Sequence, residues 1–232
     1  MTETVPGPGG AAVGRRLAQV VMKLWSVRRH GVENVPRAGP VILAPNHAGF
    51  IDAPLLMGTC PRPVHTLAKK ELFKGPVGWV LRGVGQIPLD REEPGRDLLE
   101  AGLGVLEDNR ILVVFPEGTR GAGDFSEMRT GLAWFALRSG APVVPIIFGG
   151  TGARGRTLAG LPRLRQRLDV VFGAPVTLPT GGPRTRSALE AATEQLREAL
   201  VSNRAAAYSM LHDPEADLRS SRRHDDGPEP CA

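Results

Sequence analysis

A chain of 232 residues with 41% hydrophobic and 23% charged residues is long enough for one domain with a substantial core, and no internal segment has the composition of a linker. The net charge of +5 and a pI of about 9.9 favour anionic partners: nucleic acid, anionic lipid headgroups or phosphorylated small molecules. A single tyrosine, with no zinc-ligand set and no aromatic–basic stacking motif in the sequence, argues against nucleic acid.

Signals for secretion and for membrane insertion are missing from the sequence. No stretch reaches the roughly 20 continuous apolar residues that a membrane span requires, and the Pro/Gly-rich first dozen residues do not form a secretory signal. The two cysteines, Cys60 and Cys231, suggest no disulfide framework and have no metal-ligand spacing. We therefore expect a cytoplasmic protein whose contact with the inner face of the cell membrane is peripheral, with no bound metal.

The amino-terminal part of the chain predicts a flexible leader over residues 1–12, followed by an amphipathic basic helix over residues 13–29. The helix is indicated by apolar residues recurring at three- and four-residue spacing, namely Val13, Leu17, Val20, Val21, Leu24 and Val27. No acid occurs from Gly14 to Val32. Such a helix either lies in the interface of an anionic membrane or packs on the domain with its cations solvated.

Beyond this helix, short β-like runs alternate with helical patterns, which is typical of an α/β domain with a largely parallel sheet. We expect strands over residues 41–44, 65–68, 111–115, 143–148 and 168–172, and helices over residues 53–57, 72–82, 96–109, 130–139 and 187–208. The prediction is a single domain over residues 13–212, with a motif-bearing core over residues 30–180 and a disordered tail over residues 213–232. Ligands of such sheets gather at the carboxyl ends of the strands.

A histidine and an aspartate follow the first predicted core strand. His47 and Asp52 are five positions apart, which on one continuous helix corresponds to a rotation of roughly 500° and places them about 140° apart. A turn carrying His47 before a helix that begins near Asp52 would let the carboxylate reach the ring. An imidazole can take a proton from an alcohol, and a carboxylate fixes its tautomer. This pair predicts a general base with its orienting residue.

A second polar block follows the predicted strand over residues 111–115. It consists of Phe115, Pro116, Glu117, Gly118, Thr119 and Arg120. The planar fork of Arg120 is suited to clasp phosphate oxygens, Thr119 to add a hydroxyl bond, and Glu117 to orient Arg120 or the substrate. The alternative is a polar turn with an exposed ion pair.

Other nucleophiles are poorly supported by the sequence. No Gly-x-Ser-x-Gly elbow occurs, and nothing next to Cys60 in the sequence would lower its pKa. A base without a nucleophilic side chain favours direct attack by a substrate alcohol on an acyl thioester, with the imidazolium then protonating the departing thiol.

Four blocks in this order resemble the glycerolipid acyltransferases, the 1-acylglycerol-3-phosphate (lysophosphatidic acid) acyltransferase family and its relatives. The blocks are Asn46–Asp52, Gly85–Arg91, Phe115–Arg120 and Pro142–Ile146. The resemblance implies a glycerol-3-phosphate acyltransferase-like α/β fold and catalysis by His47 and Asp52. It assigns binding of the phosphate-bearing acceptor to the Phe115–Arg120 block and Arg91, and we add Asn46 to the substrate-binding residues.

The implied reaction moves a fatty acyl group from acyl-CoA or acyl carrier protein, as co-substrate, to the free hydroxyl of 1-acylglycerol-3-phosphate, forming phosphatidic acid. The expected partners are the lysophospholipid acceptor, the acyl thioester donor, acyl carrier protein and an anionic membrane surface, with no bound cofactor. Two alternatives stay open: the same chemistry on another lysophospholipid, a glycolipid or a specialised alcohol, and a catalytically silent lipid-binding protein. A basic cluster between Arg154 and Arg167 is suited to anionic lipid or coenzyme A phosphates, or is simply solvated.

Overall fold

The structure is a computed structural model that describes residues 5–46, 49, 51–89, 96–117, 125, 128–151, 161–179 and 185–211. The described strands form one seven-stranded sheet in the order β1-β7-β6-β2-β5-β3-β4. Their bounds are β1 Ser26–His30, β2 Val41–Pro45, β3 Val64–Lys69, β4 Ile87–Leu89, β5 Ile111–Val113, β6 Val143–Gly149 and β7 Arg167–Phe172.

Strand direction divides the sheet into two parts. Strands β6, β2, β5, β3 and β4 run parallel to one another, whereas β7 is antiparallel to β6 and pairs in parallel with the edge strand β1. The sheet is therefore mixed but largely parallel. The carboxyl ends of the five parallel strands from β6 to β4 lie at the same edge of the sheet. The expected α/β fold with a largely parallel sheet is confirmed.

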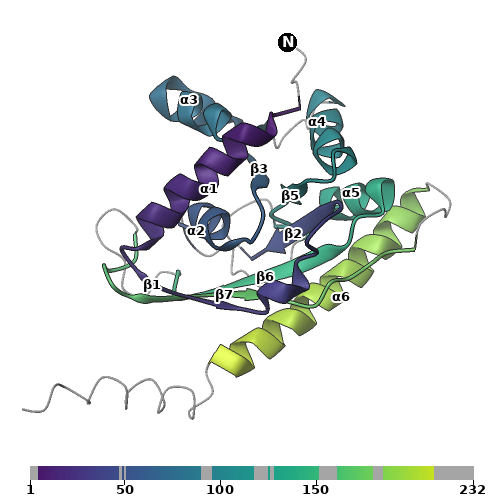
Figure 1. Ribbon diagram of the computed structural model, residues 1–232. Helices are drawn as coiled ribbons and strands as arrows, with labels where there is room; N and C mark the ends of the chain where they lie inside the picture. The colour runs from purple at the N-terminus through teal and green to yellow at the C-terminus, as the bar shows by residue number, and fades with distance from the viewer. Residues whose placement is uncertain are drawn as a thin grey trace, which may run out of the picture.

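Helices cover both faces of the sheet (Figure 1). Their bounds are α1 Pro8–Met22, α2 Asp52–Thr59, α3 Gly75–Gly83, α4 Arg96–Glu107, α5 Gly131–Ser139 and α6 Arg186–Leu211, with short 3-10 turns η1 Val32–Asn34 and η2 Lys70–Phe73. Helices α1 and α2 pack on one face, with α3 beside α1, and α4, α5 and α6 pack on the other.

The central strand β2 shows why these residues form a doubly covered sheet. Val41 and Leu43 belong to the core beneath α1 and α2, while Ile42 and Ala44 belong to the core beneath α4, α5 and α6. All four are fully buried. A parallel strand covered on both sides has no polar face, so its sequence reads as a continuous apolar run.

Most predicted elements are confirmed, but the amino-terminal boundaries are corrected. The helix predicted over residues 13–29 spans Pro8–Met22, and Ser26–His30 form strand β1 along β7. Residues 8–12, predicted as part of a flexible leader, thus belong to α1. One local and one long-range effect explain the difference: Pro8 fixes a helical φ at the first turn, and pairing with β7 overrides the helical spacing of the apolar residues after Trp25.

Two further differences concern short elements. The helix predicted over residues 72–82 is divided into η2 and α3 because Gly75 has a φ of +59°, which no continuing helix allows. Strand β4 has only three residues, too few to give a sequence period. The predicted tail over residues 213–232 lies outside the described residues. No helix in the described part of the chain is long and apolar enough to cross a bilayer.

A buried histidine links β3 to the segment around Gly85. His65 is fully buried, and its Nδ1 lies 2.8 Å from the Gly85 carbonyl oxygen, so Nδ1 carries the proton. Its Nε2 lies 3.3 Å from an Arg110 guanidinium nitrogen and accepts from it. Burial lowers the pKa of His65, and Arg110 acts in the same direction, whereas Gly85 and Asp108 oppose the shift.

We expect the free energy of unfolding to fall as the pH drops below about 6.5, the pKa of histidine in the unfolded chain. The folded pKa is lowered, so the contribution of neutral His65 is complete above that pH and is lost as the pH falls through the folded pKa. Urea unfolding at a series of pH values measures this. The variant His65→Gln should flatten that part of the profile; an unchanged slope would contradict the assignment.

Candidate active site

The carboxyl ends of β6, β2 and β5 lie side by side and bring three of the sequence blocks together. In the β2–β5 pair Leu43 is opposite Val113, and in the β2–β6 pair Pro45 is opposite Ile146. Because the three strands are parallel, the segments that follow them leave the sheet at the same edge. The neighbouring order β6-β2-β5 was not predictable from chain order, since these strands are far apart in the sequence.

Asn46 fixes the path of the chain as it leaves β2. Asn46 is 1% exposed. Its backbone N–H donates to the Ile146 carbonyl at 3.0 Å, and its side-chain Oδ1 accepts from the Phe148 N–H at 2.9 Å. These bonds tie the residue next to His47 to strand β6. Its Nδ2 has no hydrogen-bond partner among the described residues, so a buried amide donor is present at this edge.

Asp52 is the first residue of α2 and is fully buried. Its Oδ2 accepts the N–H of Gly49 at 2.7 Å, so the carboxylate closes the turn that follows Asn46. A carboxylate is favoured in the first turn of a helix, where free backbone N–H groups and the helix dipole are positive. The structure therefore has the predicted helix beginning at Asp52, with its carboxylate bonded back to Gly49.

Glycine is required at position 49 by the neighbouring strand end. A Cβ atom added to Gly49 would lie 2.4 Å from the carbonyl oxygen of Thr151, which follows β6. Thr151 is 1% exposed, and its Oγ1 has no hydrogen-bond partner within the described ranges. Sequence reasoning missed both residues. The position of Thr151 directly after a predicted strand was the available signal, because parallel strands present their carboxyl ends together.

The block after β5 begins with Phe115, Pro116 and Glu117, which lie within the described part of the chain. Phe115 is half-buried and Pro116 is buried, and the Pro116 carbonyl accepts the N–H of Arg129 at 3.0 Å. Glu117 is 8% exposed, and its Oε1 accepts the N–H of the fully buried Phe125 at 2.8 Å. Glu117 thus ties the chain after β5 to the backbone at Phe125, a role that the sequence did not reveal.

Several predicted site residues lie outside the described residues. They are His47, Arg91, Gly118, Thr119 and Arg120, together with Arg154 and Arg156 of the basic cluster. Their predicted roles stay predictions. The residues around them are fixed: Asn46 and Gly49 flank position 47, and β4 ends at Leu89 just before Arg91.

The described residues offer no cluster of three or more His, Cys, Asp or Glu side chains that could hold a metal ion. Cys60 is fully buried, and burial raises the pKa of its thiol to about 11. The thiolate is the nucleophilic form of cysteine, so Cys60 is held in the unreactive form at neutral pH.

Comparison with known sequences identifies the family. The family model described as Acyltransferase matches residues 26–149, which run from β1 to the end of β6. The chain belongs to the acyltransferase family. The matched range contains every described element of the site except Thr151, which follows it directly.

Relatives of this acyltransferase carry a more specific name. The chain is 32% identical over 161 residues to the 1-acyl-sn-glycerol-3-phosphate acyltransferase of Bacillus subtilis, covering 68% of this chain and 78% of the relative. It is 30% identical over 167 residues to the Streptococcus pneumoniae protein of the same name, covering 68% of this chain and 60% of that relative. The resemblance read from the four blocks is thus confirmed.

A solved structure supports the fold. The 1-acyl-sn-glycerophosphate (LPA) acyltransferase PlsC from Thermotoga maritima superposes with a TM-score of 0.60 at 23% sequence identity, covering 83% of this chain and 78% of that one. At this identity the likeness establishes a shared fold, with the sheet and helices of the acyltransferase in the same arrangement.

We expect Gly49→Ala to reduce acyltransferase turnover by about a hundredfold while the protein stays folded, because a shift of roughly 1 Å in a catalytic turn has this effect. The added methyl would meet the Thr151 carbonyl at 2.4 Å and push the turn away from β6. Steady-state rates and the thermal midpoint measure the two effects. Gly131→Ala is the matched control, since an added Cβ there has no neighbour within 4 Å; equal activity of both variants would contradict the prediction.

Two substitutions at Glu117 separate its hydrogen bond from its charge. Glu117→Ala leaves the buried N–H of Phe125 without its acceptor and should cost about 1–3 kcal/mol of unfolding free energy. Glu117→Gln keeps an acceptor oxygen and should recover most of that stability. Chemical denaturation of both variants measures the difference. If both variants lose the same stability, the bond to Phe125 is not what Glu117 contributes.

Proposed function

We propose that this acyltransferase moves a fatty acyl group from acyl-CoA or acyl carrier protein to the free hydroxyl of 1-acylglycerol-3-phosphate, forming phosphatidic acid. The names of the Bacillus subtilis and Streptococcus pneumoniae relatives support this acceptor. The observation that carries the proposal is the buried Asp52 carboxylate, which accepts the N–H of Gly49, two residues after position 47.

In the proposed mechanism His47 is the general base and Asp52 its orienting residue. His47 takes the hydroxyl proton of the acceptor as that oxygen attacks the thioester carbonyl carbon. When the carbon–sulfur bond breaks, the imidazolium returns the proton to the departing thiolate. The products are the new ester and a free thiol, and the His47 side chain both takes up and returns the proton. No covalent enzyme intermediate is needed.

Acceptor binding is assigned to the segments that follow β4 and β5. Arg91 and Arg120 are proposed to hold the phosphate, with Thr119 and the backbone at Gly118 beside it. The fixed positions of Phe115, Pro116 and Glu117 support this assignment, because they hold the start of that segment at the edge of the sheet that also carries Asn46. The Nδ2 of Asn46, for which the described residues offer no partner, is a donor of the right type for a substrate oxygen.

Membrane association is proposed to be peripheral and to use α1, at the inner face of the cell membrane. Helix α1 has apolar side chains on its outer side and contains no acidic residue. The acceptor and the ester product of the proposed reaction are amphipathic lipids, and a basic, apolar helix can lie in an anionic membrane interface.

The experiment that tests this function is an assay of the purified protein against a panel of acceptors and both thioester donors. We expect the highest kcat/KM with 1-acylglycerol-3-phosphate, and lower values with lysophospholipids that carry substituted phosphates and with glycolipids. His47→Ala should lower kcat by at least about a thousandfold, because a general base contributes a factor of this size.

His30→Ala is the matched control for that substitution. His30 lies in β1 and contacts Asp169 at 2.9 Å, away from the β2 turn, so its loss should leave kcat within about twofold. A preference for another alcohol would replace the proposed acceptor. Retained activity in His47→Ala would remove the assigned base, and zero turnover of the unmodified protein on every acceptor, with lipid binding retained, would point to a silent lipid-binding protein.

A further inference from the structure

Helix α1 is attached to the domain by three small residues and by Met22 at its end, and it turns its other large apolar residues outward. Its buried positions are Ala11, Gly14, Ala18 and Met22. Its exposed apolar positions, continuing into the residue pair that follows the helix, are Val13, Leu17, Val20, Val21 and Leu24. The apolar stripe that the sequence displays is therefore not the stripe that packs against the core.

Close packing fixes this orientation of α1. A Cβ atom added to Gly14 would lie 2.7 Å from Met57 Cε in α2 and 2.8 Å from Val84 Cβ at the end of α3. A Cβ atom added to Gly58 would meet the backbone of Ala18 at 3.2 Å. No larger side chain fits at Gly14 or Gly58, so α1 keeps this orientation and its outer stripe stays available for a partner.

Helix α3 lies beside α1 (Figure 1), and the segment formed by η2 and α3 exposes a second set of apolar side chains. Trp79 is 81% exposed, and Leu72, Val77 and Val80 are also exposed. Burial of α3 itself is limited to Gly78. Tryptophan combines a large apolar ring with one N–H donor, and it is enriched where a membrane meets water.

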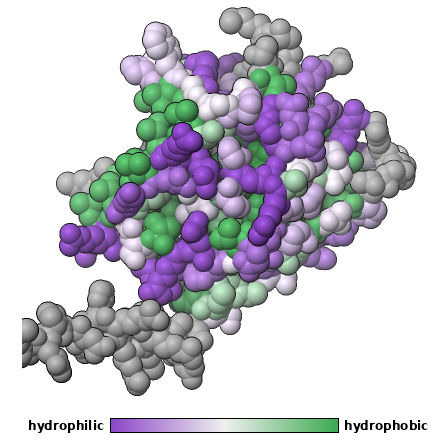
Figure 2. Space-filling model, in the orientation of Figure 1, coloured by the Kyte–Doolittle hydropathy of each residue, from purple (hydrophilic) through white to green (hydrophobic). Residues whose placement is uncertain are grey.

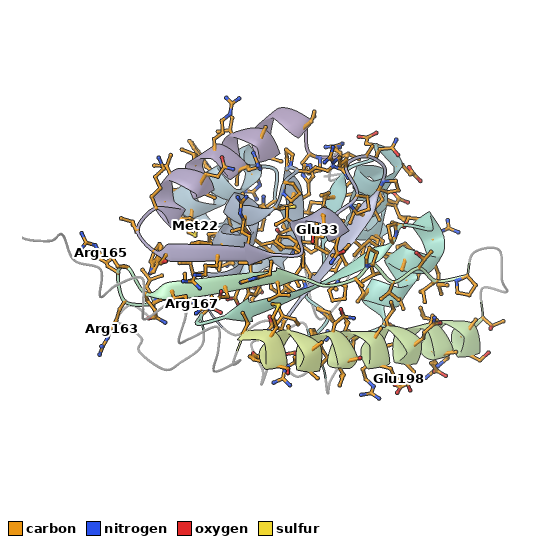
Figure 3. All side chains as sticks on the ribbon, turned by 60° about the horizontal axis from the view of Figure 1, so that its bottom comes forward. Met22, Glu33, Arg163, Arg165, Arg167 and Glu198 are labelled. Atoms are coloured by element: carbon orange, nitrogen blue, oxygen red, sulfur yellow. The ribbon has the colours of Figure 1, made fainter. Side chains whose placement is uncertain are left out.

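A third segment, residues 161–167, continues the surface at the end of α1. The Arg165 N–H donates to the Leu24 carbonyl at 2.8 Å, and Trp25 Nε1 donates to the Pro162 carbonyl at 3.3 Å. Leu164 is 69% exposed at the tip of this segment. In Figure 3, Arg163 and Arg165 extend outward from the molecule, whereas Met22 lies between α1 and the sheet.

The charges on these three segments are almost all positive. The exposed cations are Arg16, Lys23, Lys69, Lys70, Lys74, Arg82, Arg163 and Arg165. Glu71 is the one acid in residues 5–30, 69–83 and 161–167. Figure 2 shows hydrophobic residues gathered over α1 and α3 with hydrophilic residues among them.

This combination favours one type of occupant. Two copies of the chain would bring like charges together, and protein interfaces are depleted in lysine. An anionic bilayer accommodates both features, because apolar side chains enter the acyl boundary while Lys and Arg contact the headgroups.

We propose that α1, residues 69–83 and residues 161–167 form a single docking face that lies on an anionic membrane, with Trp79 of α3 as an anchor separate from α1. The proposal rests on the proposed function and extends it from one helix to three segments. Gln166 Nε2 donates to the Gly150 carbonyl at 2.9 Å, next to Thr151. The docking face is thus joined directly to the edge of the sheet that carries the site, so a docked enzyme holds that edge close to its lipid substrates.

Binding to vesicles tests the docking face. The probe is phosphatidylcholine vesicles with and without phosphatidylglycerol, and the measurement is cosedimentation together with Trp79 fluorescence. Trp79→Ala should weaken partitioning into the anionic vesicles by about tenfold, which corresponds to about 1.4 kcal/mol. Added salt should weaken binding further, since it screens the cations.

A matched pair of substitutions controls for general effects of a new charge. Val80 in α3 and Val201 in α6 are both exposed helical valines, but Val201 lies on the helix that covers the other face of the sheet. Val80→Glu should reduce anionic-vesicle binding by more than about tenfold, and Val201→Glu by less than about twofold. Both variants should have unchanged circular dichroism spectra.

Activity separates failure of the docking face from failure of the proposed function. With 1-acylglycerol-3-phosphate dispersed in nonionic detergent, Trp79→Ala should keep the unsubstituted kcat, whereas with the same acceptor in vesicles its rate should fall about tenfold. If Trp79→Ala and Val80→Glu bind the vesicles as well as the unsubstituted protein does, the docking face is overturned, whatever the activity of the two variants. Conversion of a dimer to a monomer by Val80→Glu, with vesicle binding unchanged, would assign the surface to self-association instead.

Discussion

The parallel pairing of β2 with β6 on one side and β5 on the other is the constraint on which the site depends. It places the exits of three strands at one edge, so that Asn46, Glu117 and Thr151 follow strands that lie side by side although they are distant in the chain. The backbone bonds from Asn46 to Ile146 and from Phe148 to Asn46 extend this pairing beyond the last paired residue of β2. The acyltransferase therefore fixes Asn46, the residue that follows β2, by sheet register and by hydrogen bonds to β6.

Three contacts fix the described residues between β2 and α2. The Asp52 carboxylate accepts the Gly49 N–H, Asn46 is tied to β6, and the Thr151 carbonyl lies against Gly49. A buried carboxylate is costly unless its oxygens accept hydrogen bonds, and the first turn of α2 supplies favourable electrostatics as well. The described residues on either side of the predicted base, His47, are thus held in a rigid frame. The same frame explains why the second residue after His47 is glycine.

In helix α1 most of the large apolar side chains are exposed rather than buried. Small residues allow its backbone to approach α2 and α3 closely, and this contact excludes large side chains. The large apolar residues consequently face away from the domain, where they are continuous with α3 and with the 161–167 segment. With the lipid acceptor that we propose, a surface of this kind would place the enzyme in the same environment as its substrate.

The sequence by itself determined the fold class, most of the strands and helices, and the family, because the hydrophobic periods are local and the four blocks are specific combinations. The blocks also identified Asp52 and Glu117 before their surroundings were known. Local patterns could not reveal that Gly49 contacts Thr151, that Glu117 holds the backbone of Phe125, or that β1 is a strand, since each depends on a partner far along the chain. Periodicity marks an apolar stripe on α1 but cannot say which side packs. Only the tertiary structure decided this, because close contact selects small residues and leaves the large ones outside.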